Sequence, residues 1–192
     1  MHAALLQEFK KHITLTAEEE ELIIANFRYK KVKRNQVLVQ PPDLAIYEHF
    51  VISGCLFEYY LDDNGTQHTL IFAPEGWWAT DLTSFLTGKD SRYHIETLED
   101  SELLIVSKES LDKLLTKVPA LNSYFRVLYQ NAIMGLEERV QCMLSTKVEE
   151  RYLRFLKKYP QLQNRIPQYI IASYLGVTPE FFSRMKSKIH KS

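Results

Sequence analysis

The chain has 192 residues, which is enough for one large domain or two small ones. With 45% hydrophobic and 25% charged residues, its composition is that of a soluble globular protein. It has no apolar run close to the roughly 20 residues that span a bilayer. Its N-terminus lacks the long apolar region and the cleavage site of a signal peptide. We therefore expect a cytoplasmic protein that does not enter a membrane.

The two cysteines, Cys55 and Cys142, are too few for a disulfide framework or a four-thiolate metal cluster, and we expect them to be buried. The net charge is zero, but its distribution is uneven. From residue 140 onward there are ten Lys and Arg against three Glu, a net charge of +7, whereas residues 1–139 carry −7. A basic C-terminal part is expected where a protein meets phosphates.

The first part of the chain predicts two helices followed by a set of short strands. The helices are expected at 2–12 and 17–28, and a capping box from Thr16 to Glu19 opens the second. Alternating apolar residues then predict strands at 29–39, 49–61, 66–73, 93–98 and 101–106. Gly54 marks a bulge or a close approach within one strand. Short strands with regular turns indicate a small antiparallel barrel or roll.

A helix is expected at 108–117, and a longer one runs from about residue 120 to 144. Its inner positions step by three and four residues at Leu121, Phe125, Leu128, Ala132, Leu136, Arg139 and Met143. This seam could pair with a second copy of the chain or pack on the chain's own sheet. Because the helix is longer than a small roll needs, we favour dimerisation.

The C-terminal part predicts three further helices. A second capping box, from Thr146 to Glu149, is expected to open a helix that ends before Pro160. Residues 168–187 then indicate two short helices around a tight turn, because Gly176 accepts the left-handed conformation that a sharp turn needs. Thr178 is expected to cap the second helix, and Pro179 suits its first position.

The spacing within residues 168–189 assigns an inner and an outer face to the two helices. The inner positions are Ile171, Leu175, Phe182, Met185 and Ile189. The outer side chains of the second helix are Glu180, Ser183, Arg184 and Ser187, and the same helix carries Lys186 and Lys188. An ordinary helical hairpin would have similar caps. The short turn and the basic exposed face favour a DNA-binding helix-turn-helix.

Together these elements predict an α+β protein with three parts. Residues 1–118 form an antiparallel β-roll, residues 119–144 a long dimerisation helix, and residues 145–192 an all-α helix-turn-helix domain without a clear wing. The order of the three parts resembles the Crp-Fnr superfamily of bacterial transcription regulators. The stretches 95–105 and 166–184 are similar to a branch common in Bacteroidetes-type bacteria. The resemblance implies a cyclic-nucleotide-binding-like roll, a homodimer that binds double-stranded DNA, and RNA polymerase as a further partner.

The resemblance also implies roles for single residues. Glu180 and Arg184 match the pair that reads base edges in the major groove, where Arg binds guanine and Glu accepts from cytosine. Ser183, Lys186 and Lys188 are better placed to contact phosphates, where Thr178 could offer its backbone amide, and Pro179 begins the same helix. The segment 161–166 is too short and too polar for the hairpin wing that many family members have.

The family's phosphate-binding cassette is poorly matched. Gly-Glu in the family corresponds to Thr80 and Asp81, and Arg followed by Ser or Thr corresponds to Arg92 and Tyr93. Thr80 adds a side chain where glycine leaves room for a phosphate, and Asp81 is one methylene shorter than Glu. We therefore disfavour a cyclic nucleotide as the ligand. An iron–sulfur sensor is excluded by the cysteine count, and a lone His94 is weak support for heme.

Two other classes of function remain open. An enzyme built on the roll would need a metal site or a nucleophile, but the sequence has no His-x-His pair, no nucleophile elbow, no Walker loop and no Gly-rich dinucleotide fingerprint. We therefore predict no catalysis and no metal. The remaining alternative is a small-ligand or cyclic-nucleotide module whose DNA-binding end is weak or vestigial. The C-terminal charge of +7 argues against it.

Overall fold

The computed structural model describes residues 1–189 and divides into two compact units. Unit 1 comprises Met1–Tyr60 and Ile71–Gln130, and unit 2 comprises Leu61–Leu70 together with the chain from Asn131 onward. The tip of one β-hairpin, residues 61–70, thus belongs with the C-terminal helices. Within residues 1–189, no helix is both long enough and apolar enough to cross a membrane.

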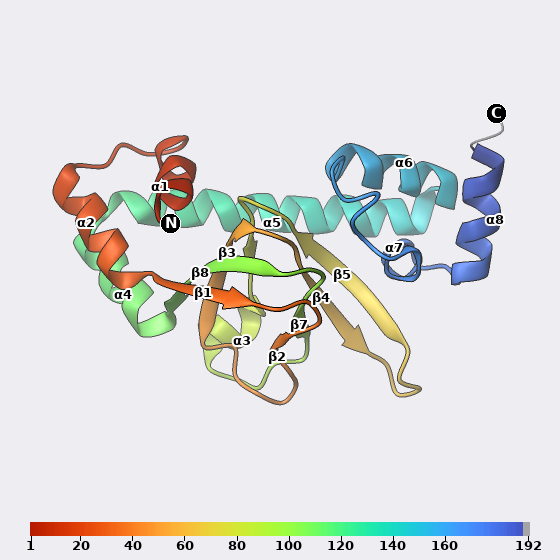
Figure 1. Ribbon diagram of the computed structural model, residues 1–192, viewed down its shortest axis with the longest axis horizontal. Helices are drawn as coiled ribbons and strands as arrows, with labels where there is room; N and C mark the ends of the chain where they lie inside the picture. Colours follow the sequence, from red (N-terminus) through yellow and green to blue (C-terminus); the bar gives the residue numbers. More distant parts are fainter. Residues whose placement is uncertain (190–192) are drawn as a thin grey trace. The chain divides into compact units, whose positions relative to one another are not determined.

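The elements follow the expected order (Figure 1). The helices are α1 (Ala3–Lys10), α2 (Ala17–Asn26), α3 (Leu82–Thr87), α4 (Lys108–Lys117), α5 (Ala120–Ser145), α6 (Val148–Lys158), α7 (Gln168–Leu175) and α8 (Pro179–Ile189). The strands are β1 (Arg28–Val32), β2 (Val37–Val39), β3 (Tyr47–Ser53), β4 (Leu56–Leu61), β5 (Gln67–Ala73), β6 (Trp78–Ala79), β7 (His94–Thr97) and β8 (Ser101–Ser107).

The strands form two four-stranded sheets, in the orders β1-β8-β3-β6 and β2-β7-β4-β5. Pairing is antiparallel between β1 and β8, β3 and β8, and β4 and β7, with Phe50 opposite Leu104 in the first sheet. The predicted α+β architecture with an antiparallel roll is confirmed. The capping box from Thr16 to Glu19 is confirmed as well, since both of its hydrogen bonds form.

The single strands expected at 29–39 and at 49–61 are wrong, because each is two strands in different sheets. β3 ends at Ser53 and β4 begins at Leu56, with Gly54 between them at φ +93°. A Cβ atom on Gly54 would overlap the side chain of Ser101 and approach the carbonyl oxygen of Asp100 to 2.9 Å. Gly54 is therefore required both by its backbone conformation and by the close approach of the β7–β8 turn.

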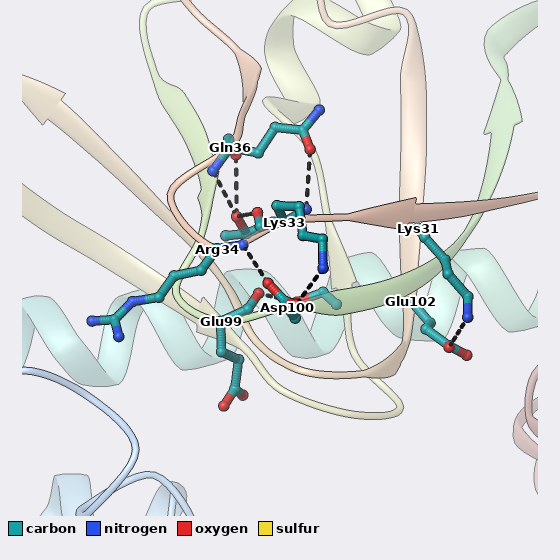
Figure 2. Close-up of polar contacts among 9 residues, drawn as sticks. Lys31, Lys33, Arg34, Gln36, Glu99, Asp100 and Glu102 are labelled. Carbon is teal, nitrogen blue, oxygen red and sulfur yellow. Dashed lines mark hydrogen bonds and ion pairs between the residues drawn. The ribbon is translucent and has the colours of Figure 1, made fainter.

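Asp100 ties the β7–β8 turn to the β1–β2 connection (Figure 2). Its carboxylate accepts hydrogen bonds from the backbone amide of Arg34 at 2.9 Å and from the ammonium group of Lys33 at 2.8 Å. The pKa of Asp100 is lowered, first by the hydrogen bond from Lys33. Lys31 pairs with Glu102 at 3.2 Å on the neighbouring strands. These contacts are exposed, so their main effect is to fix the geometry of the turn.

The core of unit 1 also takes the first turns of the long helix. Leu121, Phe125 and Tyr124 of α5 are buried with strand residues of the roll, and the indole nitrogen of Trp78 donates to the hydroxyl of Tyr124 at 2.9 Å. For this half of α5 the packing alternative is correct, and the predicted seam does not face a second copy there. α5 nevertheless continues without a break to Ser145 (Figure 1).

A buried carboxyl group lies between the roll and α5. Glu48 of β3 is 1% exposed, and its Oε1 atom accepts a hydrogen bond from the hydroxyl of Tyr129 at 3.0 Å. Burial raises the pKa of Glu48 from 4.5 to about 7, although the hydrogen bond from Tyr129 opposes that shift. The neutral acid is therefore the form that suits the folded core.

This burial predicts a pH-dependent stability. Because the folded state holds the Glu48 proton up to about pH 7, whereas the unfolded chain releases it near 4.5, the free energy of unfolding should fall as pH rises between those values. The loss should be on the order of 3 kcal/mol. Glu48→Gln can still accept from Tyr129 and should lack this loss. Urea unfolding of both proteins at several pH values measures it, and a constant difference between them would contradict the assignment.

Candidate nucleic-acid interface

The C-terminal part of unit 2 is a small helical bundle. Tyr152 of α6 contacts Phe182 of α8 edge-on at 5.2 Å, and Phe155 of α6 lies 5.7 Å from Tyr174 of α7. Residues 159–167, between α6 and α7, form turns without a strand, and Leu162 and Ile166 in this segment are buried.

The capping box expected at Thr146 is wrong. The residue before α6 is Lys147, which makes no side-chain cap. The hydroxyl of Thr146 donates instead to the carbonyl oxygen of Cys142 at 2.7 Å, at the end of α5. Only two residues separate α5 from α6. Thr146 is therefore close enough to satisfy the last turn of the preceding helix instead of the first turn of the next.

The helix-turn-helix has the predicted local structure. α7 ends at Gly176 in the left-handed conformation at φ +71°, and the amide of Val177 donates back to the carbonyl oxygen of Ala172 at 3.0 Å. Thr178 caps α8, because its hydroxyl accepts from the amide of Phe181 at 3.3 Å. Pro179 is the first residue of α8, where its missing N–H has no partner to lose.

The two faces of α8 separate as the spacing predicts. Phe182 and Met185 are buried, and Ile189 is half-buried. The outward residues are Thr178, Pro179, Glu180, Ser183, Arg184, Ser187 and Lys188, all of which are exposed, while Lys186 is half-buried at the edge of that face. All predicted DNA-contact residues therefore belong to one short helix and its cap. Phe181 is also exposed on the same helix, and it is not among the residues predicted from the sequence to contact DNA.

Glu180 and Arg184 lie one turn apart near the start of α8. The pKa of Glu180 is lowered, first by a hydrogen bond from its own backbone amide, then by the Thr178 hydroxyl, with a smaller contribution from Arg184. Glu180 is therefore an anionic acceptor at the helix N-terminus, next to a cation. A base pair offers both a donor and acceptors in the major groove, which such a pair can read together.

The tip of the β4–β5 hairpin holds α7 within unit 2. The hydroxyl of Ser173 accepts from the amide of Thr69 at 2.9 Å and donates to the carbonyl oxygen of Gln67 at 2.6 Å. β5 is the outer strand of its sheet, so these groups lie on an edge that no other strand pairs. Ser173 therefore replaces a neighbouring strand over two residues of β5.

Arg139 of α5 completes this junction. One of its guanidinium nitrogens donates to the carbonyl oxygen of Thr69 at 2.8 Å and to that of Tyr174 at 3.0 Å. The guanidinium group also lies over the ring of Tyr174, 4.1 Å from its centroid. Arg139 thus links three elements, α5, β5 and the end of α7. The sequence spacing assigned Arg139 to a dimer seam, and nothing in the pattern signalled the hairpin as its partner.

The residues that the sequence assigns to a ligand pocket of the roll make hydrogen bonds with neighbouring groups of the chain. Asp81 is 2% exposed and caps α3 by accepting from the amide of Ser84 at 3.0 Å. Its other oxygen accepts from the Ser91 hydroxyl at 2.7 Å and from the Arg92 amide at 3.1 Å. Asp81 and Arg92 therefore meet, but through the backbone of Arg92.

The remaining pocket residues are turned to other partners. The hydroxyl of Thr80 donates to the carbonyl oxygen of Tyr47 at 3.0 Å. The guanidinium group of Arg92 lies 6.0 Å from the centroid of the Tyr93 ring, and the residue is exposed. Within residues 1–189 there is also no group of three or more His, Cys, Asp or Glu residues that could hold a metal ion.

The Ser173 contacts predict a measurable contribution to stability. Ser173→Ala should leave the Thr69 amide and the Gln67 carbonyl without their partner, at a cost of about 1–3 kcal/mol in the free energy of unfolding. Exchange of the Thr69 amide hydrogen should become faster. Ser123→Ala, at an exposed position of α5, is the matched control. An unchanged exchange rate at Thr69 would show that Ser173 does not hold the hairpin.

Comparison with known proteins finds a matching domain family and relatives that are regulatory proteins. Residues 29–118 match the cyclic nucleotide-binding domain family. The chain is 26% identical to the fumarate and nitrate reduction regulatory protein of Vibrio cholerae, over 86% of this chain and 70% of that protein. It is 24% identical to the regulatory protein HlyX of Actinobacillus pleuropneumoniae, over 86% and 72%. Both relatives are regulatory proteins.

Solved structures share the fold. FixK2 from Bradyrhizobium japonicum matches with a TM-score of 0.75 at 18% identity, over 86% of this chain and 85% of that one. The regulator CLP of Xanthomonas campestris matches with a TM-score of 0.71 at 18% identity, over 92% of each chain. A protein of Eubacterium rectale assigned to the Crp/Fnr family matches with a TM-score of 0.72 at 19% identity, over 92% and 84%. Residues 29–118 thus match the cyclic nucleotide-binding domain family, and the chain is similar over most of its length to two regulatory proteins and shares the fold of these three solved structures.

Proposed function

We propose that this protein is a homodimeric transcription regulator that binds a near-palindromic DNA sequence through α8. The observation that carries the proposal is the exposed face of α8, on which Glu180 and Arg184 lie one turn apart above a buried apolar side. A recognition helix needs this division, because its inner face must hold it to the bundle while its outer face enters the major groove. The C-terminal charge of +7 matches a phosphate partner.

The outer residues divide by the chemistry that each can supply. Arg184 has the planar fork that binds the O6 and N7 atoms of guanine, and Glu180 can accept from the amino group of cytosine. Ser183, Lys186 and Lys188 lie on the same helix and can bind phosphates, which position the helix without reading sequence. Thr178 and Pro179 begin α8, so their place fixes the depth at which the helix enters the groove.

The second half of α5 supplies a surface for a second copy. Ile133, Leu136, Val140 and Met143 are between 45% and 58% exposed and follow the spacing of alternating a and d positions in a coiled coil. This register shares Leu136 and Met143 with the seam inferred from the sequence, but Ala132 and Arg139 are replaced by Ile133 and Val140. A pair of such helices would hold two recognition helices about one DNA turn, roughly 34 Å, apart.

The signal that controls the regulator acts, in this proposal, at the roll. A cyclic phosphate at the candidate pocket would meet the carboxylate of Asp81, which already takes the hydrogen bonds of Ser91 and of the Arg92 amide. Two anions on the same donors repel each other, so we keep a cyclic nucleotide as the disfavoured ligand. The same proposal includes a cytoplasmic location and RNA polymerase as a partner. It also includes a Bacteroidetes-type branch of the Crp-Fnr superfamily, inferred from residues 95–105 and 166–184.

Two variants of α8 separate sequence reading from phosphate binding. Arg184→Ala should weaken binding to a selected operator by about 1–3 kcal/mol and relax the preference at one base step. Lys186→Ala should weaken binding to all duplexes alike and reduce the salt dependence. Fluorescence anisotropy with operator, mutated and random duplexes at one salt concentration measures both. If both variants bind every duplex as the wild type does, α8 is not the reading helix, and a ligand-binding module with a vestigial DNA end becomes the better account.

The proposed dimer surface can be tested by introducing one charged residue into it. Val140→Glu should place two carboxylates in an apolar interface and raise the dimer dissociation constant on the order of 100-fold. Gln141→Glu adds the same charge at the neighbouring exposed position, outside the a and d register, and should leave the dimer intact. Sedimentation equilibrium of the two variants gives the result. Equal effects would mean that this stripe is not the interface.

A further inference from the structure

Two neighbouring phenylalanines of α8 have opposite environments. Phe182 is fully buried and contacts Tyr152 edge-on at 5.2 Å. Phe181 is 42% exposed, and within residues 1–189 its ring has no aromatic or cationic partner. Phe182 is explained by the bundle. The exposed Phe181 ring can instead bury apolar surface against a partner outside the chain.

The position of Phe181 is fixed by the helix cap. It is the third residue of α8, and its amide donates to the Thr178 hydroxyl at 3.3 Å. Residues at the start of a recognition helix are the ones that contact base edges. The ring is therefore held at the end of α8 that the proposed function assigns to the bases.

The neighbours of Phe181 restrict what its partner can be. Arg184 and Lys188 follow at three and seven residues, so they lie on the same side of α8, and all three residues are exposed. An apolar ring beside two cations suits a partner that combines negative charge with a small apolar group. The major groove of DNA offers this combination at thymine, whose C5-methyl group is the one apolar group on a base edge there.

We propose that Phe181 recognises a thymine of the operator by packing its ring against the C5-methyl group, next to the base pair that Arg184 reads. This inference rests on the proposed function and adds a residue that determines specificity. Glu180 and Arg184 read by hydrogen bonds, whereas Phe181 reads a shape that cytosine and the purines lack. The operator half-site should therefore contain a thymine at one fixed step from the base pair contacted by Arg184.

The test removes the methyl group from the DNA and the ring from the protein in one cycle. An operator selected from genomic fragments is synthesised with each thymine of the half-site replaced, one at a time, by deoxyuridine. Dissociation constants are measured by fluorescence anisotropy for the wild type, Phe181→Ala and Phe181→Leu. Tyr169→Ala, at a 57% exposed aromatic residue of α7, is the control variant. Circular dichroism verifies that each variant is folded.

The wild type should lose about fourfold in affinity at one thymine position, which is the effect of one buried methyl group. Phe181→Ala should bind the unmodified operator more weakly and show no loss at that position. Phe181→Leu should keep part of the sensitivity, and Tyr169→Ala should keep all of it. The proposal is overturned if Phe181→Ala retains the wild-type loss at every position, or if the wild type shows no loss at any.

The same measurements separate this inference from the function on which it rests. If Arg184→Ala loses the operator preference while deoxyuridine has no effect, the regulator assignment stands and the role of Phe181 is wrong. If the wild type binds operator and random duplexes equally, both proposals fail together.

Discussion

The open edge of β5 is the constraint on which the arrangement of unit 2 depends. An outer strand carries backbone groups that no ladder satisfies, and leaving them without partners would destabilise the hairpin tip. Ser173 and Arg139 supply the missing partners at Gln67 and Thr69. Because Arg139 also donates to the carbonyl oxygen of Tyr174 near the end of α7, satisfying the strand edge positions the first helix of the helix-turn-helix. The Gly176 turn and the Thr178 cap then set α8 relative to α7.

In the roll, too, a side chain of the chain itself supplies the hydrogen-bond partner that neighbouring groups need. Asp81 accepts three hydrogen bonds, from Ser84, Ser91 and Arg92, inside a domain that matches the cyclic nucleotide-binding family. Both oxygens of this buried group accept hydrogen bonds, and displacing it would leave the three donors to be satisfied by another acceptor. The α3 cap is therefore stable without a ligand. This explains how the roll can fold with Asp81 buried beside α3.

Local features of the chain could be predicted from the sequence, because their causes lie within a few residues. The Thr16 capping box, the Gly176 turn and the inward Phe182 and Met185 were all predicted correctly. The predictions were wrong where residues far away in the sequence determine the local structure. The strand at 49–61 divides where the β7–β8 turn approaches Gly54. The first turns of α5 are buried because their apolar side chains pack against strand residues of the roll. Nothing in the spacing of Arg139 or Ser173 indicated a hairpin seventy or more residues away.

The helix α5 has more than one role, although the sequence pattern predicted a single dimerisation seam along it. Its first turns pack into the core of unit 1 through Leu121 and Phe125. Further along, the exposed stripe from Ile133 to Met143 and the inward Arg139 lie on different sides of the same turns. A helix is stiff, so a rotation of these turns about the axis would displace the stripe and the Arg139 contacts together. A change in how the stripe packs would therefore also change the hydrogen bonds from Arg139 to the carbonyl oxygens of Thr69 and Tyr174. In the proposed dimer, one arginine side chain would thus link the exposed stripe to the helix-turn-helix.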